Sequence, residues 1–328
     1  MNIRSVLVSF AVASVLLVGT AADESSYRSA ATSKAPTPEA VPHPSVVSSA
    51  TSEPIAPPCN LLGSLRPPQG TLPEPGRMPA GSMMAGIAER GRLIVGVGPD
   101  TYLINFRNPE TGELEGFDID VAGDIAEAIF GDRAKVEYRQ LDLPERLAAA
   151  ASGEIDLMVS TTTITCRRRA QVEFSTVYFQ AGQQVLVNRD SGITGLDDLA
   201  GKPVCASRGS TSLQKILTAP SGPFPVGALS ATDCLVMLQL GEVDAVSTDD
   251  ALLAGLAAQD PRTEIVGPRF NPEPYGVAIN PAAQDLVRFV NAVLARRVED
   301  GRWRASYQRW LETRLGPPPA PPEPQYRD

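Results

Sequence analysis

One stretch of the chain gathers side chains that could do chemistry, Ser160 to Ser175, with the sequence STTTITCRRRAQVEFS. Four threonines precede three consecutive arginines, and Cys166 stands at the join. A guanidinium is always charged, its planar fork of N–H donors matches a carboxylate, and nearby hydroxyl groups can complete an anion site. The stretch therefore indicates an anion-binding site, with three solvated surface arginines as the alternative.

Overall composition limits the partner and the chemistry. The 328 residues carry a formal net charge of -9, which argues against nucleic acid or an anionic membrane surface as partner. The one histidine, His43, stands in a proline-rich stretch, so histidine-based triads and histidine-rich metal sites are excluded. We expect neither metal nor cofactor, while enzymes built on lysine, carboxylate or cysteine chemistry remain open.

The N-terminal residues 1–22 are typical of a secretory signal, because Arg4 precedes an uncharged apolar run that ends in small residues. Cleavage after Ala21 or Ala22 is expected, since Thr20 occupies the place of a lipobox cysteine. Retention as a signal anchor is the alternative. In both cases the protein is exported to the extracellular side of the cell envelope, either soluble or tethered through its N-terminus.

Four cysteines in an exported chain suggest two disulfides, for which three pairings exist. We favour Cys205–Cys234, both in the second half of the globular region, together with Cys59–Cys166, which would fasten the leader to the body. A redox-active pair is disfavoured because the chain has no Cys-x-x-Cys motif.

The chain divides by composition and periodicity. Residues 23–58 read as a disordered Pro- and Ser-rich tether, 59–84 as a leader segment, and 316–328 as a Pro-rich tail. Between them strands alternate with helices, as in RLIVGVG followed by GFDIDVAGDIAEAIF, and the alternation restarts after Val187. This predicts an α/β protein with a first lobe at 85–183, a second lobe at 184–278, and a return to the first at 279–315.

Several motifs occur in order: GFDIDVAGDIAEAI, EIDLMVSTTTITCRRR, LAGKPVCASRGSTS, VDAVSTDD, YGVAIN and DGRWRASYQRW. Together, from Arg92 to about Gly316, they resemble the extracellular solute-binding proteins for polar amino acids (family 3). Cysteine placement, leader and tail resemble the actinobacterial glutamate- or glutamine-binding lipoproteins, from which the missing lipobox cysteine departs. The resemblance implies the type II periplasmic-binding fold, two mixed, mostly parallel sheets joined by two hinge crossings.

By position in the motif, the resemblance implies that Arg168 binds a ligand α-carboxylate. It implies that Ser160, Thr161 and Thr163 accompany this arginine, with Thr161 and Thr163 sharing a face because they stand two apart in a strand. Plain β-propensity of threonine is the alternative.

The second lobe is expected to supply the other contacts. Ser210 and Thr211 begin a helix after Gly209, where exposed N–H groups favour an anion, although an ordinary N-cap would look the same. The resemblance implies that Asp249, which closes a strand, binds the ligand ammonium, while Asp250 could be the cap of the next helix.

The ligand side chain is expected to meet residues of the first lobe. Arg146 matches an arginine of binders of acidic amino acids, and it could pair with a side-chain carboxylate; an exposed helical arginine is the alternative. Asp100 or Tyr102 should form the cleft wall. The family often carries an acidic residue where this chain has Gly98.

These features predict a monomeric binding protein that closes over a polar amino acid. Glutamate and aspartate are favoured, and glutamine and asparagine are possible. The partner would be the permease of an ABC importer or a membrane sensor. The alternative is an enzyme on the same fold, such as a cyclohexadienyl-type dehydratase, with Asp100 or Asp249 as general acid.

Overall fold

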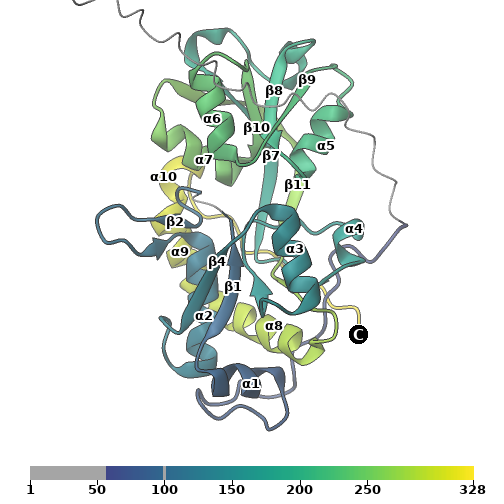
Figure 1. The fold of residues 1–328 in the computed structure, drawn as a ribbon, viewed down its shortest axis with the longest axis vertical. Coiled ribbons are helices and arrows are strands. Elements are labelled where there is room, and N and C mark those ends of the chain that lie inside the picture. The colour runs from purple at the N-terminus through teal and green to yellow at the C-terminus, as the bar shows by residue number, and fades with distance from the viewer. Residues whose placement is uncertain (1–56, 99–100) are drawn as a thin grey trace, which may run out of the picture. The chain divides into compact units, whose positions relative to one another are not determined.

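The computed structural model describes residues 57–98 and 101–328, and these form two α/β lobes (Figure 1). The expected signal at 1–22 and nearly all of the tether at 23–58 lie outside the described residues, as does Asp100. The described residues all belong to one compact unit of the chain.

Lobe 1 is built on a five-stranded sheet in the order β4-β1-β5-β12-β6. Strand β1 is parallel to β4 and β5, whereas β12 is antiparallel to β5 and β6. The strands are β1 Leu93–Val97, β4 Val136–Gln140, β5 Leu157–Met158, β6 Glu173–Phe174 and β12 Ala278–Ile279, with the hairpin β2 Phe106–Arg107 and β3 Leu114–Glu115. The helices are α1 Met83–Arg90, α2 Phe117–Phe130, α3 Leu143–Ser152, α4 Cys166–Arg169, α8 Gln284–Glu299, α9 Arg302–Trp310 and α10 Glu312–Leu315.

Lobe 2 is built on a second five-stranded sheet in the order β11-β7-β10-β8-β9. Strand β8 is parallel to β9 and β10, and β7 is antiparallel to β10 and β11. The strands are β7 Phe179–Asn188, β8 Pro203–Ser207, β9 Phe224–Ala228, β10 Ala245–Asp249 and β11 Thr263–Tyr275. The helices are α5 Thr211–Leu217, α6 Ala231–Gln239 and α7 Asp250–Gln259, with the short 3-10 turns Arg189–Ser191 and Leu196–Leu199.

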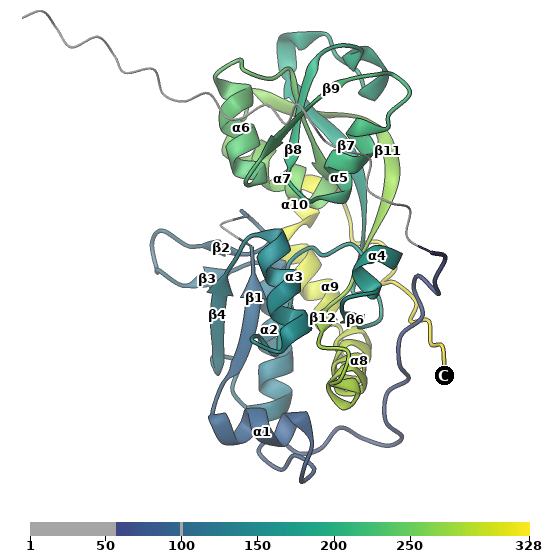
Figure 2. The same cartoon turned by 45° about the vertical axis from the view of Figure 1, so that its right-hand side comes forward.

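The two lobes are joined by β7 and β11, which run side by side as an antiparallel pair (Figure 2). Their lobe 1 ends meet at Phe179 and Tyr275, whose rings stack with centroids 5.6 Å apart and belong to the core of lobe 1. The pairing becomes irregular between Val266 and Asn271. The type II architecture with two hinge crossings is therefore present.

The central strand β1 is apolar and buried at every position because it has strands on both sides and helices over both faces of the sheet. In β1, Leu93 and Val95 belong to the core shared with α2, α8 and α9, whereas Ile94 points to a second cluster that includes α3. Successive side chains of a strand point to opposite faces, which explains this alternation.

Glycines flank helix α2 on both sides and follow the last residue of helix α3. At the start of α2, Gly116 has φ +132°, and a Cβ there would lie 2.2 Å from the carbonyl oxygen of Ile104, so only glycine fits. Gly131 ends α2 and Gly153 ends α3, both in the left-handed region. Helix α3 starts with a capping box in which Asp142 and Glu145 each accept a backbone N–H of the other.

The leader and the tail are ordered against each other and against lobe 1. Ser64 forms a bridge with Tyr326, and its backbone N–H donates to the carbonyl of Gln325 at 2.9 Å. The disulfides are Cys59–Cys166, which fastens the leader to α4, and Cys205–Cys234 inside lobe 2. This is the pairing that the sequence favoured.

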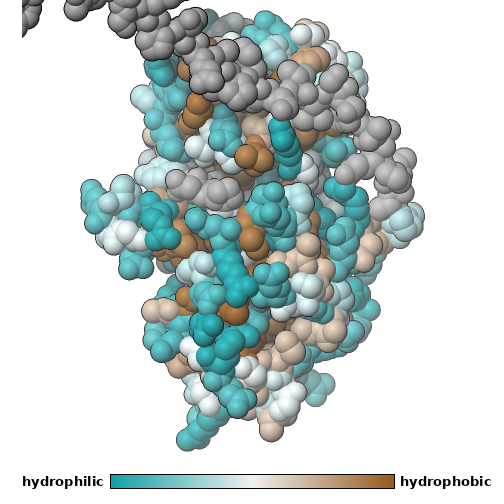
Figure 3. Space-filling model, in the orientation of Figure 1, coloured by the Kyte–Doolittle hydropathy of each residue, from teal (hydrophilic) through white to brown (hydrophobic). Residues whose placement is uncertain are grey.

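No helix in residues 57–98 and 101–328 is long and apolar enough to cross a membrane. Hydrophilic side chains cover much of the face of lobe 1 shown in Figure 3, with apolar atoms scattered between them.

One buried side chain, Asn291 of α8, joins the leader to the approach to the hinge. Its carbonyl oxygen accepts the backbone N–H of Thr176 at 2.8 Å, and its amide donates to Ser64 Oγ at 2.8 Å and to the Leu65 carbonyl at 2.7 Å. Three segments distant in sequence thus depend on one amide.

Replacing the Asn291 amide should lower the free energy of unfolding. Asn291→Ala removes the partner of the buried Thr176 N–H and of the Leu65 carbonyl, so we expect the free energy of unfolding to fall by about 2–4 kcal/mol. Urea denaturation measures this. Asn108→Ala, in the partly exposed β2–β3 turn, is the control and should cost less than about 1 kcal/mol. Equal losses for both variants would contradict the role given to Asn291.

Candidate functional site

A cleft of about 90 Å³ lies between the lobes, at the carboxyl ends of β1, β5, β8 and β10. Open α/β sheets present their binding residues at these ends. Lobe 1 lines the cleft with Gly98, Thr101, Asp142, Leu143, Arg146, Ser160, Thr161, Thr163 and Arg168. Lobe 2 lines it with Ser207, Arg208, Ser210, Thr211, Ser212, Leu229, Ser230, Ala231, Thr248, Asp249 and Leu252.

Arg168 is the member of the arginine triplet that lines the cleft. It is 3% exposed, and its Nη1 donates to the Thr163 carbonyl at 2.8 Å. Its Nη2 donates across the cleft to the carbonyl of Gly209 in lobe 2 at 3.4 Å. Arg169 turns the other way and donates to the Leu61 carbonyl and to Glu173. The triplet is therefore not a solvated patch.

The one-turn helix α4 that carries Arg168 is held from two directions. The Thr165 hydroxyl caps its start by accepting the Arg168 N–H at 3.2 Å. Cys166, its first residue, is bonded to Cys59 of the leader. So short a helix has little stability of its own, and these two attachments fix it.

The prediction that a strand runs through the threonines is wrong. Strand β5 ends at Met158, and Thr161 has φ +41°, a left-handed conformation rare for a β-branched residue. Thr161 and Thr163 do not share a strand face, yet the loop brings both to the cleft together with Ser160. Ser160 Oγ accepts the Gly98 N–H at 2.9 Å and the Asn105 amide at 3.2 Å.

Asp118, which the sequence analysis did not single out, holds Thr161 in this conformation. Its carboxylate accepts the Thr161 N–H at 2.8 Å and the Tyr178 hydroxyl at 2.9 Å. Burial raises the pKa of Asp118 from 3.8 to about 7, and the bonds from Tyr178 and Thr161 only partly offset this. The signal was present in the sequence as an acidic residue in the first turn of α2.

Arg146, on α3, is buried and lines the cleft rather than pointing into solvent. Its Nη1 donates to the Leu141 carbonyl at 2.7 Å, and its Nε has no hydrogen-bond partner among the described residues. Burial and the neighbouring Arg168 lower the pKa of Arg146 to about 10, so it remains charged at neutral pH. A Cβ on Gly98 would lie 2.7 Å from Arg146 Nη1, so the guanidinium occupies the space beside that glycine.

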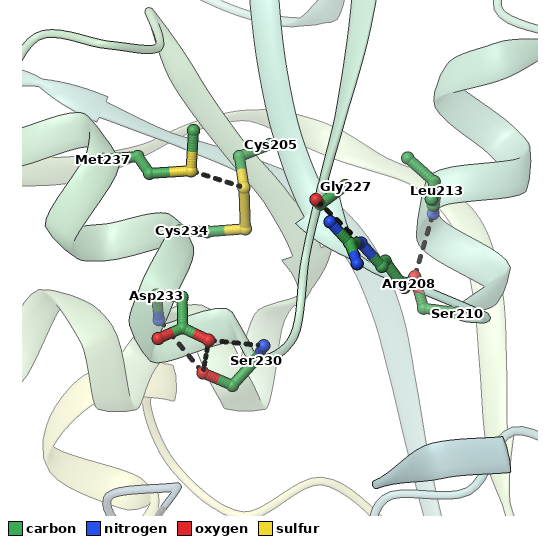
Figure 4. Close-up of a disulfide and its surroundings, with 9 residues drawn as sticks. All are labelled: Cys205, Arg208, Ser210, Leu213, Gly227, Ser230, Asp233, Cys234 and Met237. Atoms are coloured by element: carbon green, nitrogen blue, oxygen red, sulfur yellow. Dashed lines mark hydrogen bonds between the residues drawn. A yellow bond between two sulfur atoms is a disulfide. The ribbon is translucent and has the colours of Figure 1, made fainter. Parts of the chain in front are cut away.

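On lobe 2, Ser210 and Thr211 play different parts. Ser210 caps α5 by accepting the Leu213 N–H at 3.0 Å, as Figure 4 shows. The Thr211 hydroxyl donates to Glu273 at 2.9 Å and lies 3.5 Å from the Thr163 hydroxyl of lobe 1. Both residues line the cleft, so capping and cleft lining coexist at Ser210.

The two consecutive aspartates, Asp249 and Asp250, have different surroundings. Asp249 lines the cleft and accepts the Tyr275 hydroxyl at 2.6 Å. Burial, and then the nearby Glu273, raise its pKa well above 3.8. Asp250 is the first residue of α7; it pairs with Arg269 and accepts the backbone N–H of Gly182.

One expected wall residue is not in the cleft. Tyr102 is 37% exposed, and its ring packs edge-on against Phe106 with centroids 4.8 Å apart. Its neighbour Thr101 lines the cleft instead. Asp100, the other candidate, lies outside the described residues.

A third cleft arginine, Arg208, was not foreseen. It follows β8, and its Nε donates to the Gly227 carbonyl at 3.2 Å (Figure 4). Among the described residues, the charged lining of the cleft thus consists of three arginines and the two aspartates Asp142 and Asp249. In the described part of the chain no cluster of three or more His, Cys, Asp or Glu residues could hold a metal ion. The cleft can bind a small molecule that carries both negative and positive charge.

The raised pKa of Asp118 makes a stability prediction. Between pH 3.8 and about 7 the folded protein binds a proton here that the unfolded chain does not. The free energy of unfolding therefore falls as the pH rises through this window. Asp118→Asn does not titrate and keeps an acceptor for the Thr161 N–H. We expect it to reduce the loss of stability from pH 5 to pH 8 by about 2 kcal/mol in urea denaturation.

The matched control for this change is Asp197→Asn, an exposed aspartate of lobe 2. It should leave the pH profile of the wild type unchanged. If the Asp118→Asn profile also coincided with that of the wild type, the protonation assigned to Asp118 would be wrong.

Comparison with known proteins agrees with the fold and the cleft. Residues 93–313 match the family described as bacterial extracellular solute-binding proteins, family 3. The ABC transporter glutamine-binding protein GlnH of Bacillus subtilis is 36% identical over 70% of this chain and 84% of its own. The glutamate-binding protein GluB of Corynebacterium efficiens is 30% identical over 75% of this chain and 86% of its own.

A solved structure, an ancestral arginine-binding protein bound to glutamine, is 35% identical, with a TM-score of 0.62 over 68% of this chain and 98% of its own. These relatives are solute-binding proteins and not enzymes, so the dehydratase alternative has no support. The match explains why this chain has two lobes, two hinge strands and a charged cleft between them. The chain belongs to family 3 of the bacterial extracellular solute-binding proteins.

Proposed function

We propose that this protein binds a free amino acid with an acidic side chain, glutamate or aspartate in preference to glutamine or asparagine. The observation that carries the proposal is the presence of two buried guanidinium groups, Arg146 and Arg168, in one cleft with the carboxyl group of Asp249 opposite. An amino acid with a second carboxylate has the matching charges, two negative and one positive.

The α-carboxylate is assigned to Arg168. The fork of a guanidinium binds a carboxylate through two parallel hydrogen bonds. The Thr163 hydroxyl, which lies 3.5 Å from that of Thr211 in the other lobe, can add a further donor. A ligand placed here would contact both lobes at once.

The ammonium group is assigned to Asp249, with Thr161 on the facing lobe. A buried carboxyl with a raised pKa is costly to ionise unless a cation comes close. The ligand ammonium is that cation. Asp118 supports this contact indirectly, because it fixes the backbone of Thr161.

The side-chain carboxylate is assigned to Arg146. A charge-assisted bond to a carboxylate is stronger than one to a neutral amide. Two relatives are named as glutamine-binding and glutamate-binding proteins. Their names support a ligand of the size of glutamine or glutamate for this chain. The choice of the acid over the amide rests on Arg146.

Ligand binding would favour the closed arrangement of the lobes. In the structure a Cβ on Gly255 of α7 would lie 2.3 Å from the Tyr102 carbonyl of lobe 1, so the lobes approach closely here. A ligand that contacts both lobes shifts the population toward this state. We infer that the exported protein then delivers the amino acid to the permease of an ABC importer, with a membrane sensor as the alternative partner.

Calorimetry with glutamate, aspartate, glutamine and asparagine tests the proposal. Arg168→Ala should weaken binding of all four by about 100-fold or more, because one partner of a buried charge pair is lost. Arg167→Ala, its neighbour outside the cleft lining, should bind as the wild type does. Thermal unfolding checks that both variants fold. No binding of any of the four at millimolar ligand would refute the proposal.

Arg146→Ala tests the choice between acid and amide. We expect glutamate affinity to fall about tenfold or more and glutamine affinity to change less than about threefold, since only the acid loses a charge pair. Titration of both ligands into wild type and variant measures the ratio. Equal losses for the two ligands would show that Arg146 does not read the side-chain charge.

A further inference from the structure

Glu273, a buried residue of the hinge strand β11, does not line the cleft but contacts it through Thr211. Its side chain is 0% exposed. Its Oε2 accepts the Thr211 hydroxyl at 2.9 Å, and its Oε1 accepts the Asn271 amide at 2.6 Å. Both carboxyl oxygens therefore act as acceptors, which is the hydrogen-bonding pattern of an ionised carboxylate.

Glu273 and Asp249 are two buried carboxyl groups without an ion-pair partner among the described residues. Glu273 lies close enough to raise the pKa of Asp249, and in this it is second only to burial. Arg168 opposes the shift, but its effect on the pKa of Asp249 is smaller than that of Glu273. Buried negative charge is costly unless a cation comes close. This side of the cleft therefore favours a cationic group of the ligand.

Two consecutive hydroxyl groups at the start of α5 direct their protons to these carboxyl groups. Thr211 donates to Glu273, and the Ser212 hydroxyl donates to Asp249 at 3.4 Å. A hydroxyl has one proton and two lone pairs, whereas a carboxylate only accepts. The proton of Thr211 is thus committed to Glu273, and Thr211 presents an acceptor to the cleft that it lines.

The ligand ammonium is the group that suits this acceptor. An ammonium group has three N–H donors, and the proposed contacts with Asp249 and Thr161 use two of them. The Thr211 oxygen lies 3.5 Å from the Thr163 hydroxyl of lobe 1, where the lobes approach each other across the cleft. An oxygen held as an acceptor beside buried negative charge attracts an ammonium group and repels a carboxylate.

We propose that Glu273 is a positioning residue of the amino-acid site. By taking the proton of Thr211, it makes that hydroxyl the third acceptor for the ligand ammonium, and it thereby disfavours dicarboxylates that lack an amino group. This role rests on the proposed function and deepens it. Lobe 1 recognises the carboxylates through its arginines, whereas lobe 2 requires the ammonium.

Glu273→Gln tests this role. The new amide keeps the shape of the side chain but donates to the Thr211 oxygen, which turns the hydroxyl proton toward the cleft. We expect glutamate affinity to fall about tenfold or more. The affinity for glutarate, which is glutamate without its amino group, should stay within about threefold, because glutarate makes no ammonium contact. Calorimetry measures glutamate, and competition with glutamate measures glutarate.

The matched control is Glu264→Gln, at a partly exposed position of the same strand. It should leave the affinities for glutamate and glutarate as they are in the wild type. Thermal unfolding checks that each variant folds.

Thr211→Val shows whether Glu273 acts through the hydroxyl. The valine should lower glutamate affinity about tenfold in the wild type and less than about threefold in Glu273→Gln, because the two residues act as a unit. Thr211→Val alone should also lower the ratio of glutamate to glutarate affinity, so the test does not depend on the folding of Glu273→Gln.

The failure of this role and the failure of the proposed function give different results. A wild type that binds none of the four amino acids would refute the proposed function. An unchanged ratio of glutamate to glutarate affinity in Glu273→Gln, or losses that simply add in the double variant, would overturn the role of Glu273 and leave the proposed function standing.

Discussion

The burial of the Arg168 guanidinium at the junction of the lobes is the constraint on which the site depends. A buried cation must be surrounded by acceptors, and here carbonyls of both lobes supply them, Thr163 from one side and Gly209 from the other. The loop before α4 therefore has to leave the sheet early and turn its carbonyls inward. That loop is held in place by the left-handed conformation of Thr161, the helix cap at Thr165 and the disulfide at Cys166.

Two buried carboxyl groups contribute to the site in different ways. Asp249 faces the cleft directly, whereas Asp118 acts through the backbone of Thr161. Both have raised pKa values because burial removes water from the carboxylate. Among the described residues the cleft has three guanidinium groups and two carboxyl groups, Asp142 and Asp249, and this balance supports the proposal of an anionic ligand.

Much of this arrangement could be predicted from the sequence, because motif position carries over from one family member to another. Arg168 and Asp249 belong to that part, and the two disulfide pairs could be predicted from where the four cysteines stand in the chain. The strand through Thr161 could not be rejected from propensity, since the conformation is set by a distant carboxylate. Tyr102 was misplaced because only tertiary contact decides between the cleft and Phe106. The pairing of Ser64 with Tyr326 joins segments that look unstructured by composition alone.

Gly98 and Arg146 compete for the same space, since a side chain at position 98 would meet the guanidinium. The two positions are therefore expected to be epistatic in evolution. An acidic residue at 98 would pair with or displace Arg146 and so weaken the proposed preference for an anionic side chain. Loss of Arg146 alone would leave an empty pocket beside the glycine. Because Nη1 is the far end of a flexible side chain, the guanidinium can move aside for a small side chain at 98, so a change of ligand class can begin at either position.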